Sequence, residues 1–191
     1  MTEPCLTADE IVSVLSTGDP VPHETVKEWT RSEDIEVLGA IYYRIAQAPH
    51  PMSIEPPLTL DEYNDFFLRY IGLCLREHPE GEWAEDRVSA GRLWCGWFKR
   101  FWRRNGPSNP LVQELKRWLA GYYRDADDDL RSSVVVFLLE HLLEDPDIAA
   151  YFTDWQEDHA LAEGYEQAME WARCHHPPQK PTDEAAGDER R

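Results

Sequence analysis

The chain of 191 residues carries 19 Lys or Arg against 37 Asp or Glu, which gives a formal net charge of −18. Hydrophobic residues make up 42% and charged residues 29%, a composition typical of a soluble globular protein rather than a disordered or membrane-spanning one. A chain of this length forms one ordinary domain and buries a core without disulfides or a structural metal. The negative charge repels nucleic acid and anionic membranes, so we expect neither as a general partner.

Cysteine usage and the start of the chain indicate the cellular compartment. The four cysteines form no CxxC pair and are widely spaced, which favours free thiols in a reducing cytoplasm over a disulfide-bonded secreted domain. The first 25 residues contain no Lys or Arg, unlike a signal peptide. No apolar run approaches the roughly 18 residues of a membrane span. We therefore expect a cytoplasmic protein that does not enter a membrane.

Apolar residues recur every three or four positions through most of the chain, which predicts about eight helices and no convincing strand. Thr7 and Thr59 each precede a Glu by three residues and form capping boxes, and Asn109 before a proline is a third start signal. The segment Gly18–Pro22 and the four prolines of residues 49–57 predict breaks. The expected helices cover residues 7–15, 33–48 with Ser32 as N-cap, 59–78, 82–104, 109–122, 127–143, 146–155 and 160–175.

The middle of the helix expected over residues 127–143 is apolar on every side from Val134 to Leu139, which predicts a buried central helix. Residues 177–191 lack apolar anchors and are rich in Pro, Glu and Asp, so we expect a disordered acidic tail after a domain of residues 1–176. Short connections make successive helices antiparallel neighbours. The expected fold class is therefore an all-α single domain of about eight antiparallel helices. A compact bundle and a short HEAT-like array both stay open, because no fixed-period repeat is present.

The charge is unevenly distributed along the chain. Residues 87–124 hold nine Lys or Arg and one acidic residue, a net charge of +8, so the rest of the chain carries −26. On the helix expected there, Trp and Phe residues lie opposite an outward basic face. That predicted basic face consists of Arg92, Lys99, Arg100, Arg103 and Arg104. Three interpretations stay open: a solvated face paired with acidic neighbours, a site for phosphate, nucleic acid or an acidic protein patch, and a face masked by the acidic tail.

No catalytic, metal or cofactor motif is present in the sequence, so we predict no cofactor and no metal. Glu140 and His141 are the candidates that we name for an enzyme, as a carboxylate and a general base on the central helix. The cluster Cys174–His176 contains metal-ligand types, but adjacent residues on a helix point in different directions, which favours a frayed helix end. Gly91 and Gly96 lie inside a helical pattern and indicate that a neighbouring helix approaches closely.

One part of the chain resembles known proteins. The stretch Leu138–Pro146, followed by Tyr151–Trp155, resembles segments of small acidic all-helical bacterial proteins. Some of these are uncharacterised, and others are immunity proteins that neutralise a toxin. The resemblance covers about a quarter of the chain and consists of helix-cap and packing residues, so it implies a helical fold and transfers no functional residue.

These observations predict a non-catalytic cytoplasmic protein-protein interaction module, with an immunity-type inhibitor as a special case. Its acidic surfaces would meet a basic surface on a partner protein, because charge complementarity accelerates association. One alternative is nucleic-acid or phosphate-ligand binding through the basic helix face of residues 87–124. Another is an enzyme with a helical site around Glu140 and His141. The sequence determines neither the partner nor the oligomeric state.

Overall fold

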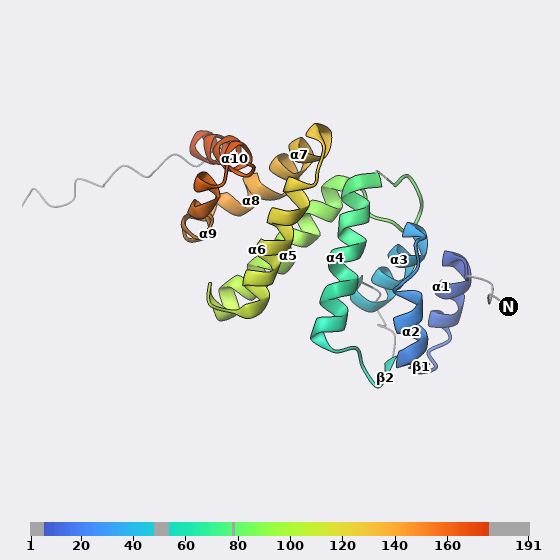
Figure 1. The fold of residues 1–191 in the computed structure, drawn as a ribbon. Helices are drawn as coiled ribbons and strands as arrows, with labels where there is room; N and C mark the ends of the chain where they lie inside the picture. The colour runs from blue at the N-terminus through green and yellow to red at the C-terminus, as the bar shows by residue number, and fades with distance from the viewer. Residues whose placement is uncertain (1–5, 48–53, 78, 176–191) are drawn as a thin grey trace, which may run out of the picture.

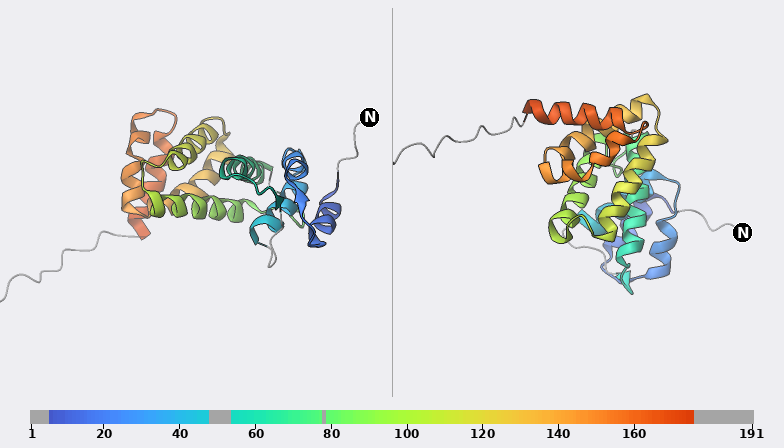
Figure 2. Two further views of the ribbon diagram at one scale, coloured as in Figure 1. Left: turned by 90° about the horizontal axis from the view of Figure 1, so that it is seen from below. Right: turned by 60° about the vertical axis from the view of Figure 1, so that its left-hand side comes forward.

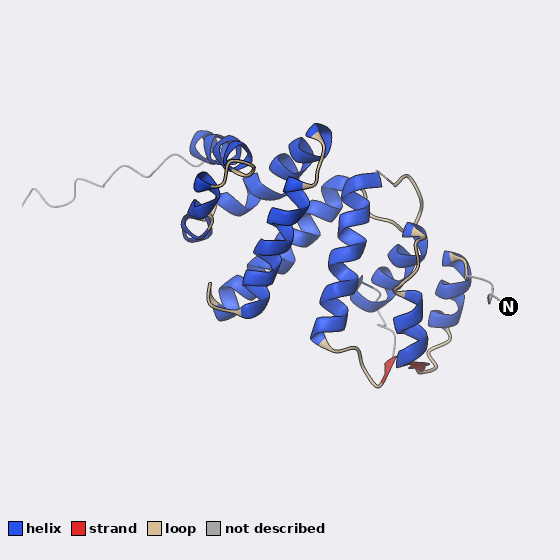
Figure 3. Ribbon diagram, viewed as in Figure 1, coloured by secondary structure: helices blue, strands red, loops and turns tan. Residues whose placement is uncertain are grey.

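The structure of the protein is a computed structural model, which describes residues 6–47, 54–77 and 79–175. Within these residues the protein is a single, mostly helical body of about nine helices with one small two-stranded sheet (Figure 1, Figure 3). The predicted all-α class is confirmed. The predicted acidic tail, residues 177–191, lies outside the described residues, as does Cys5.

The helices follow one another along the body roughly in chain order, from the N-terminal helices at one end to the C-terminal helices at the other (Figure 2). The elements of the first half are α1 (Ala8–Ser16), β1 (Val21–Pro22), α2 (His23–Trp29), α3 (Ile35–Tyr42), the π-helical η1 (Tyr43–Gln47), β2 (Ile54–Glu55) and α4 (Leu60–Glu77). Those of the second half are α5 (Arg87–Asn105), α6 (Pro110–Arg124), α7 (Asp128–Val134), the π-helical η2 (Val135–Leu139), α8 (Glu140–Leu143), α9 (Pro146–Tyr151), the 3-10 helix η3 (Thr153–Glu157) and α10 (Ala162–His175).

The predicted start signals are confirmed where the cap is local. The hydroxyls of Thr7 and Thr59 accept hydrogen bonds from the backbone N–H groups of Glu10 and Glu62, whose carboxylates accept from the two Thr N–H groups in return. Asn109 caps α6 by accepting from the first N–H groups of that helix. Each cap satisfies N–H groups that have no partner inside the helix, which fixes where the helix begins.

Other boundaries differ from the prediction. Asp34, rather than Ser32, accepts from the first N–H groups of α3. The helix expected from residue 82 begins at Arg87, because the Asp86 side chain accepts from the Ser89 N–H and caps it there. The residues before Asp86 instead cross over α3, where the Trp83 N–H donates to the Glu36 carboxylate (2.8 Å).

Three short elements, two strands and one helix, were not predicted from the sequence. The strands β1 and β2 pair in parallel, with Val21 opposite Ile54, so the prediction of no strand is wrong for these few residues. A two-residue strand is too short to produce an alternating pattern. The helix α2 is also too short to be predicted. Its seven residues contain two buried side chains, His23 and Val26, which do not form a recognisable apolar stripe.

The rod formed by α7, η2 and α8 is continuous, as the predicted central helix requires, but it is not buried on every side. Leu138, Leu139 and Leu142 are fully buried, whereas Val136 is 44% exposed. The rod therefore lies against the core along one face, with its other face toward solvent.

Helix α5 packs against α4, α6, η2 and α8 and so connects the two halves of the body. A Cβ atom at Gly91 would lie 2.7 Å from the Phe137 carbonyl oxygen, so the two backbones approach to a distance that requires glycine. One turn later the Cys95 thiol donates to the Leu138 carbonyl (3.4 Å). A further turn on, the Lys99 ammonium donates to the His141 carbonyl (2.5 Å). These three residues of α5, four positions apart, form the face that contacts η2 and α8.

The two glycines of α5 have different environments. The close approach predicted for Gly91 is confirmed, but the one predicted for Gly96 is wrong, since no atom of another helix lies within 4 Å of the place where its Cβ would stand. Gly96 is exposed and faces open space.

We expect Gly91→Ala to lower the free energy of unfolding by about 1–3 kcal/mol, because the Phe137 backbone must move to admit the methyl group. Gly96→Ala is the matched control, since it adds the same methyl group to the same helix in open space. It should raise the free energy of unfolding by about 0.5–1 kcal/mol through helix propensity. Urea denaturation followed by tryptophan fluorescence measures both changes. Equal effects of the two substitutions would contradict the close crossing.

Candidate functional site

The charges of the chain form three bands along the body. Residues 6–86 hold 5 Lys or Arg and 17 acids, a net charge of −12, and residues 125–175 hold 2 Lys or Arg and 14 acids, also −12. Between them lies the segment of residues 87–124 with its net charge of +8. Because the helices follow one another roughly in chain order (Figure 2), this segment forms a basic middle between two mainly acidic ends, although the acidic start of α7 packs back beside α4.

Four of the nine cations in the basic middle are used within the fold. They are Arg87, which pairs with Asp129 (2.8 Å), Lys116 with Asp154 (2.5 Å), Arg124 with Asp158 (2.6 Å), and Lys99, which donates to the His141 carbonyl. The prediction that Lys99 shares the outward basic face is therefore wrong. Lys99 lies on the side of α5 that faces η2 and α8, where the His141 carbonyl accepts a hydrogen bond from its ammonium group.

The other predicted members of the basic face, Arg92, Arg100, Arg103 and Arg104, are exposed. Within the described parts of the chain, no carboxylate lies within ion-pair distance of these four guanidinium groups. Described acids thus form no direct ion pair with the face. The pKa of Asp86 is nevertheless lowered, mainly by its hydrogen bond from the Ser89 backbone and to a minor extent by the Arg92 charge, so pairing with acidic neighbours stays open as an interpretation. Masking by the acidic tail concerns residues that the structure does not describe.

Two of these arginines border a groove of about 680 Å³ between α3 with η1, α4 and α5. We call it the aromatic groove, because four aromatic side chains line it together with the two cations. These residues are Tyr42, Tyr63, Phe67, Trp97, Arg92 and Arg100. The volume lies within the range of ordinary ligand sites. The groove thus combines a large apolar wall with two positive charges at one side.

The α5 side of the aromatic groove is built by residues four positions apart. Arg92, Gly96 and Arg100 follow one another at successive turns and therefore lie on one face of the helix, about 6 Å apart along its axis. Because Gly96 carries no side chain and nothing fills the space above it, a gap separates the two arginines. The sequence indicated these cations, but it gave no signal for the groove, whose other walls come from distant helices.

A hydrogen bond to a buried side chain holds the Trp97 ring in place. Its indole N–H donates to the Asn64 side-chain oxygen (3.1 Å), and the Asn64 amide donates in turn to Glu114 (3.1 Å). Asn64 is fully buried, so the polar edge of Trp97 is satisfied within the protein and its carbon surface is left for the groove. The Arg100 guanidinium lies 5.6 Å from the ring centre, which positions this cation against the same indole.

The acidic band at the C-terminal end includes an exposed face on α10. Residues 140–170 contain ten acids and no Lys or Arg. Within this segment Glu163, Glu166 and Glu170 are exposed and have the three- and four-residue spacing of one helix face. The buried side of α10 consists of small and aromatic residues such as Tyr165 and Ala168. The acidic face is therefore the solvent side of a well-anchored helix.

The residues named for an enzyme, Glu140 and His141, are adjacent on α8. Burial raises the pKa of the Glu140 carboxyl. The His141 imidazole faces Glu144, with 3.4 Å between Nδ1 and the carboxylate oxygen, and its side chain is 40% exposed. Neither Glu140 nor His141 lines either of the two cavities described in this section. The enzyme alternative thus stays a prediction that neither of these two cavities supports.

The cysteine and histidine cluster lies at the end of α10. Cys174 and His175 are exposed, and the His175 ring stacks on Trp171 at 4.2 Å, while His176 lies outside the described residues. Within the described ranges, no three His, Cys, Asp or Glu side chains are placed to hold a metal ion. Of the described cysteines, Cys74 and Cys95 are buried, and burial raises both of their pKa values to about 12.

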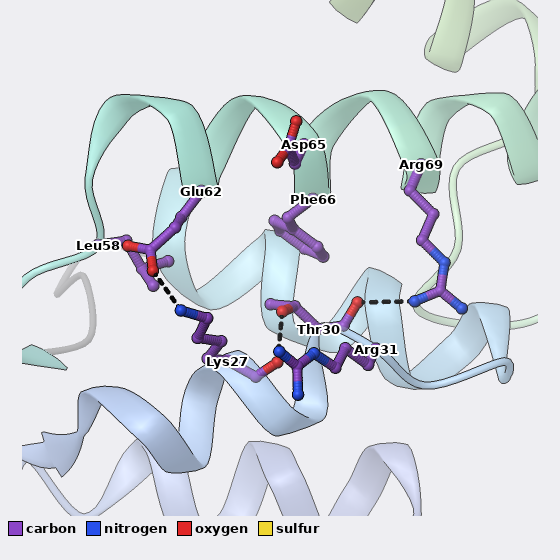
Figure 4. Close-up of a pocket in the computed structure, with 8 residues that line it drawn as sticks. All are labelled: Lys27, Thr30, Arg31, Leu58, Glu62, Asp65, Phe66 and Arg69. Carbon is purple, nitrogen blue, oxygen red and sulfur yellow. Dashed lines mark hydrogen bonds and ion pairs between the residues drawn. The ribbon is translucent and has the colours of Figure 1, made fainter.

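A smaller cavity of about 230 Å³ lies between α2 and α4 (Figure 4). Glu62 of α4 accepts a hydrogen bond from Lys27 (2.8 Å), which is the main reason that its pKa is lowered to about 2. Arg69 donates to the Thr30 carbonyl (3.1 Å), as Figure 4 also shows. Lys27 and Glu62 thus pair across the cavity, and Arg69 bonds the residue that follows α2, so these side chains connect α2 and its C-terminal end to α4.

No protein-family model, curated protein or solved structure matches this chain. The resemblance of the C-terminal stretch to small acidic bacterial proteins therefore stays a prediction. No helix among the described residues is both long and apolar enough to cross a bilayer.

Arg87 is a buried structural cation at the start of α5. It is 6% exposed and donates to the Asp129 carboxylate (2.8 Å), the Ser133 hydroxyl (3.0 Å) and the Arg76 carbonyl (3.2 Å). These three hydrogen bonds connect α5 to α7 and to the end of α4.

We expect Arg87→Met to lower the free energy of unfolding by about 2–4 kcal/mol, because three acceptors lose a charged donor. Arg92→Met removes an equal charge from an exposed position of the same helix and should change stability by about 0.5 kcal/mol or less. Urea denaturation of both variants gives the comparison. A loss for Arg87→Met no larger than that for Arg92→Met would argue against the structural role.

His23 links α2 to α4 and to the segment before it. Its Nε2 lies 3.1 Å from the Glu62 carboxylate and its Nδ1 lies 3.1 Å from the Pro56 carbonyl. The Glu62 hydrogen bond first, and then the one to Pro56, raises the pKa of His23 above its ordinary value of 6.5. A raised pKa in the folded state gives stability that is fully present below the unfolded-state pKa and lost as pH rises through the folded-state pKa.

We therefore expect the free energy of unfolding to fall as pH rises from about 6 through the raised pKa of His23. His23→Gln should flatten this slope, whereas His159→Gln, at an exposed position, should leave it unchanged. Urea denaturation at closely spaced pH values measures the slope. The same slope in His23→Gln as in the parent chain would assign the effect to another group.

Proposed function

We propose that the protein is a non-catalytic interaction protein that binds a basic surface of a partner protein through the acidic face of α10. The observation that carries this proposal is the exposed stripe of Glu163, Glu166 and Glu170. It lies in a stretch of the chain, residues 140–170, that contains no Lys or Arg. Cations of α6 pair with Asp154 and Asp158 near η3, whereas no described cation forms such a pair with the three stripe residues.

A stripe of this kind acts mainly on association. Like-signed charges on one helix face steer an oppositely charged surface into the encounter, and the rate of association falls as salt is added. Affinity then depends on side chains that become fully buried at the contact. An inhibitor of the immunity type, covering a basic surface of a toxin, is one form that such a protein would take.

Nucleic-acid binding through the basic face is the less favoured alternative. Lys99 donates to the His141 carbonyl, so the predicted face retains four exposed arginines. The chain that carries them has a net charge of −18. Non-specific nucleic-acid affinity comes from many phosphate contacts, and the two acidic bands beside the basic middle oppose them.

The test replaces the acidic face by a basic one. We expect the full chain to capture a basic protein from a lysate of its own cells at low salt, and Glu163→Lys/Glu166→Lys/Glu170→Lys to lose that protein. The control Glu77→Lys/Glu80→Lys/Glu82→Lys makes the same change in net charge at the exposed end of α4 and in the loop after it, and should retain the captured protein. Mass spectrometry quantifies the captured protein, and the association rate of the purified pair should fall about tenfold or more in the α10 variant.

Two outcomes would overturn the proposal. One is capture that is equal for the parent chain and both triple variants, since the α10 face would then play no part. The other is the absence of any basic protein whose capture decreases when salt is raised.

A further inference from the structure

The aromatic groove is a second surface that the proposed function does not use. It lies in the basic middle of the body, on the side of α5 that faces α3, η1 and α4. The acidic face of α10 lies at the C-terminal end (Figure 1). The two surfaces have opposite charges, so a basic segment that suits the α10 face would not suit the groove.

The wall of the groove is suited to an apolar anchor. Trp97 packs against Tyr63 (5.2 Å between ring centres) and Phe67 (5.3 Å), so these rings form one continuous surface. Because the Trp97 N–H is already bonded to Asn64, the ring offers carbon surface and no donor that needs a polar ligand. Burial of an aromatic or aliphatic side chain here removes apolar area from water on both partners.

The rim of the groove is suited to carboxylates. Arg92 and Arg100 are exposed and, among the described residues, have no ion pair that a ligand would have to break. Arginine presents a planar fork of donors that matches a carboxylate in a two-point contact. The two forks stand on either side of Gly96, so a ligand that lies over this glycine meets a cation at each flank.

The openness of the α5 side decides what kind of ligand fits. A small molecule bound in a protein is usually enclosed on most of its surface. Arg92, Gly96 and Arg100 are all exposed, so this side of the groove is open to solvent along about two helical turns. An open groove of that length accommodates a segment of polypeptide, with one side chain in the aromatic wall and its neighbours at the rim.

We infer that the aromatic groove binds a segment of a partner protein in which an apolar side chain is flanked by acidic residues. The apolar side chain packs on Trp97 and Tyr63 above Gly96, and the flanking carboxylates pair with Arg92 and Arg100. A basic segment would be repelled by the same two cations. This inference does not rest on the α10 proposal, and each has its own set of variants.

The probe is a displayed library of random peptides, selected on the immobilised full chain at physiological salt. We expect enrichment of peptides that carry an aromatic or large aliphatic residue between Asp or Glu residues. The most enriched peptide is then synthesised with a fluorescent label and titrated by anisotropy against the parent chain and four variants. These variants are Arg92→Glu/Arg100→Glu, Gly96→Leu, Gly96→Ala and Arg103→Glu/Arg104→Glu.

The expected pattern separates the groove from the helix as a whole. Arg92→Glu/Arg100→Glu reverses the rim and should weaken binding about tenfold or more. Gly96→Leu places a side chain in the gap, where its Cβ has room, and should weaken binding similarly. Arg103→Glu/Arg104→Glu makes the same charge change further along α5, outside the groove, and should change affinity about twofold or less. Circular dichroism and urea denaturation verify that each variant is folded. Gly96→Ala is the control for Gly96→Leu, because it replaces the same glycine with the smallest side chain and leaves most of the gap open.

Three results would overturn the inference. The first is a library with no enrichment, or with enrichment of basic peptides. The second is a selected peptide that binds all four variants as tightly as the parent chain. The third is a short single-stranded oligonucleotide that binds more tightly than the peptide and depends on Arg92 and Arg100, which would assign the groove to nucleic acid.

Discussion

The structure depends on the close crossing of α5 over the rod formed by α7, η2 and α8. Gly91 allows the backbones to approach, and the Cys95 thiol and the Lys99 ammonium then donate to the carbonyls of Leu138 and His141. Because this crossing requires glycine at one turn of α5 and hydrogen-bond donors at the next two turns, it fixes the rotation of α5 about its own axis. Because α5 also packs on α4 and α6, this rotation determines which of its faces lies against each neighbour.

The aromatic groove follows from that rotation. Arg92, Gly96 and Arg100 each stand one position after a residue of the crossing face, which is a turn of about 100° around the helix. They therefore border the space beside α3 and α4 rather than the contact with η2. Trp97 lies one step further round, where the buried Asn64 holds its indole N–H. The same helix is thus fixed on one side and offers an open surface on the adjacent one.

The sequence predicted best what depends on neighbouring residues. The capping boxes at Thr7 and Thr59, and the N-cap Asn109, fixed three helix starts because the cap and its N–H partners lie within one turn. The aromatic side of the helix predicted there also faces the core: Trp94 and Phe98 are fully buried, while Trp97, Phe101 and Trp102 are partly buried against it. Such features need no knowledge of the distant parts of the chain.

What the sequence could not supply is the identity of the neighbour on each helix face. A helical wheel places Lys99 near Arg92, but it does not show that the Lys99 ammonium donates a hydrogen bond to the His141 carbonyl of α8. It likewise treats Gly91 and Gly96 alike, although one meets Phe137 and the other meets open space. The groove was invisible for the same reason, because Tyr42 and Tyr63 reach it from other helices through contacts between residues far apart in the chain.

The banded charge distribution has a consequence for how the groove responds to its medium. At low ionic strength the screening length of about 30 Å spans much of the body, so an approaching acidic segment experiences the net charge of −18 and is repelled. At physiological ionic strength this length shrinks to about 8 Å, and the segment experiences chiefly the arginines nearest to it. Binding of such a segment in the groove would therefore pass through an optimum at intermediate ionic strength, whereas an ordinary complex of opposite charges only weakens as ions are added.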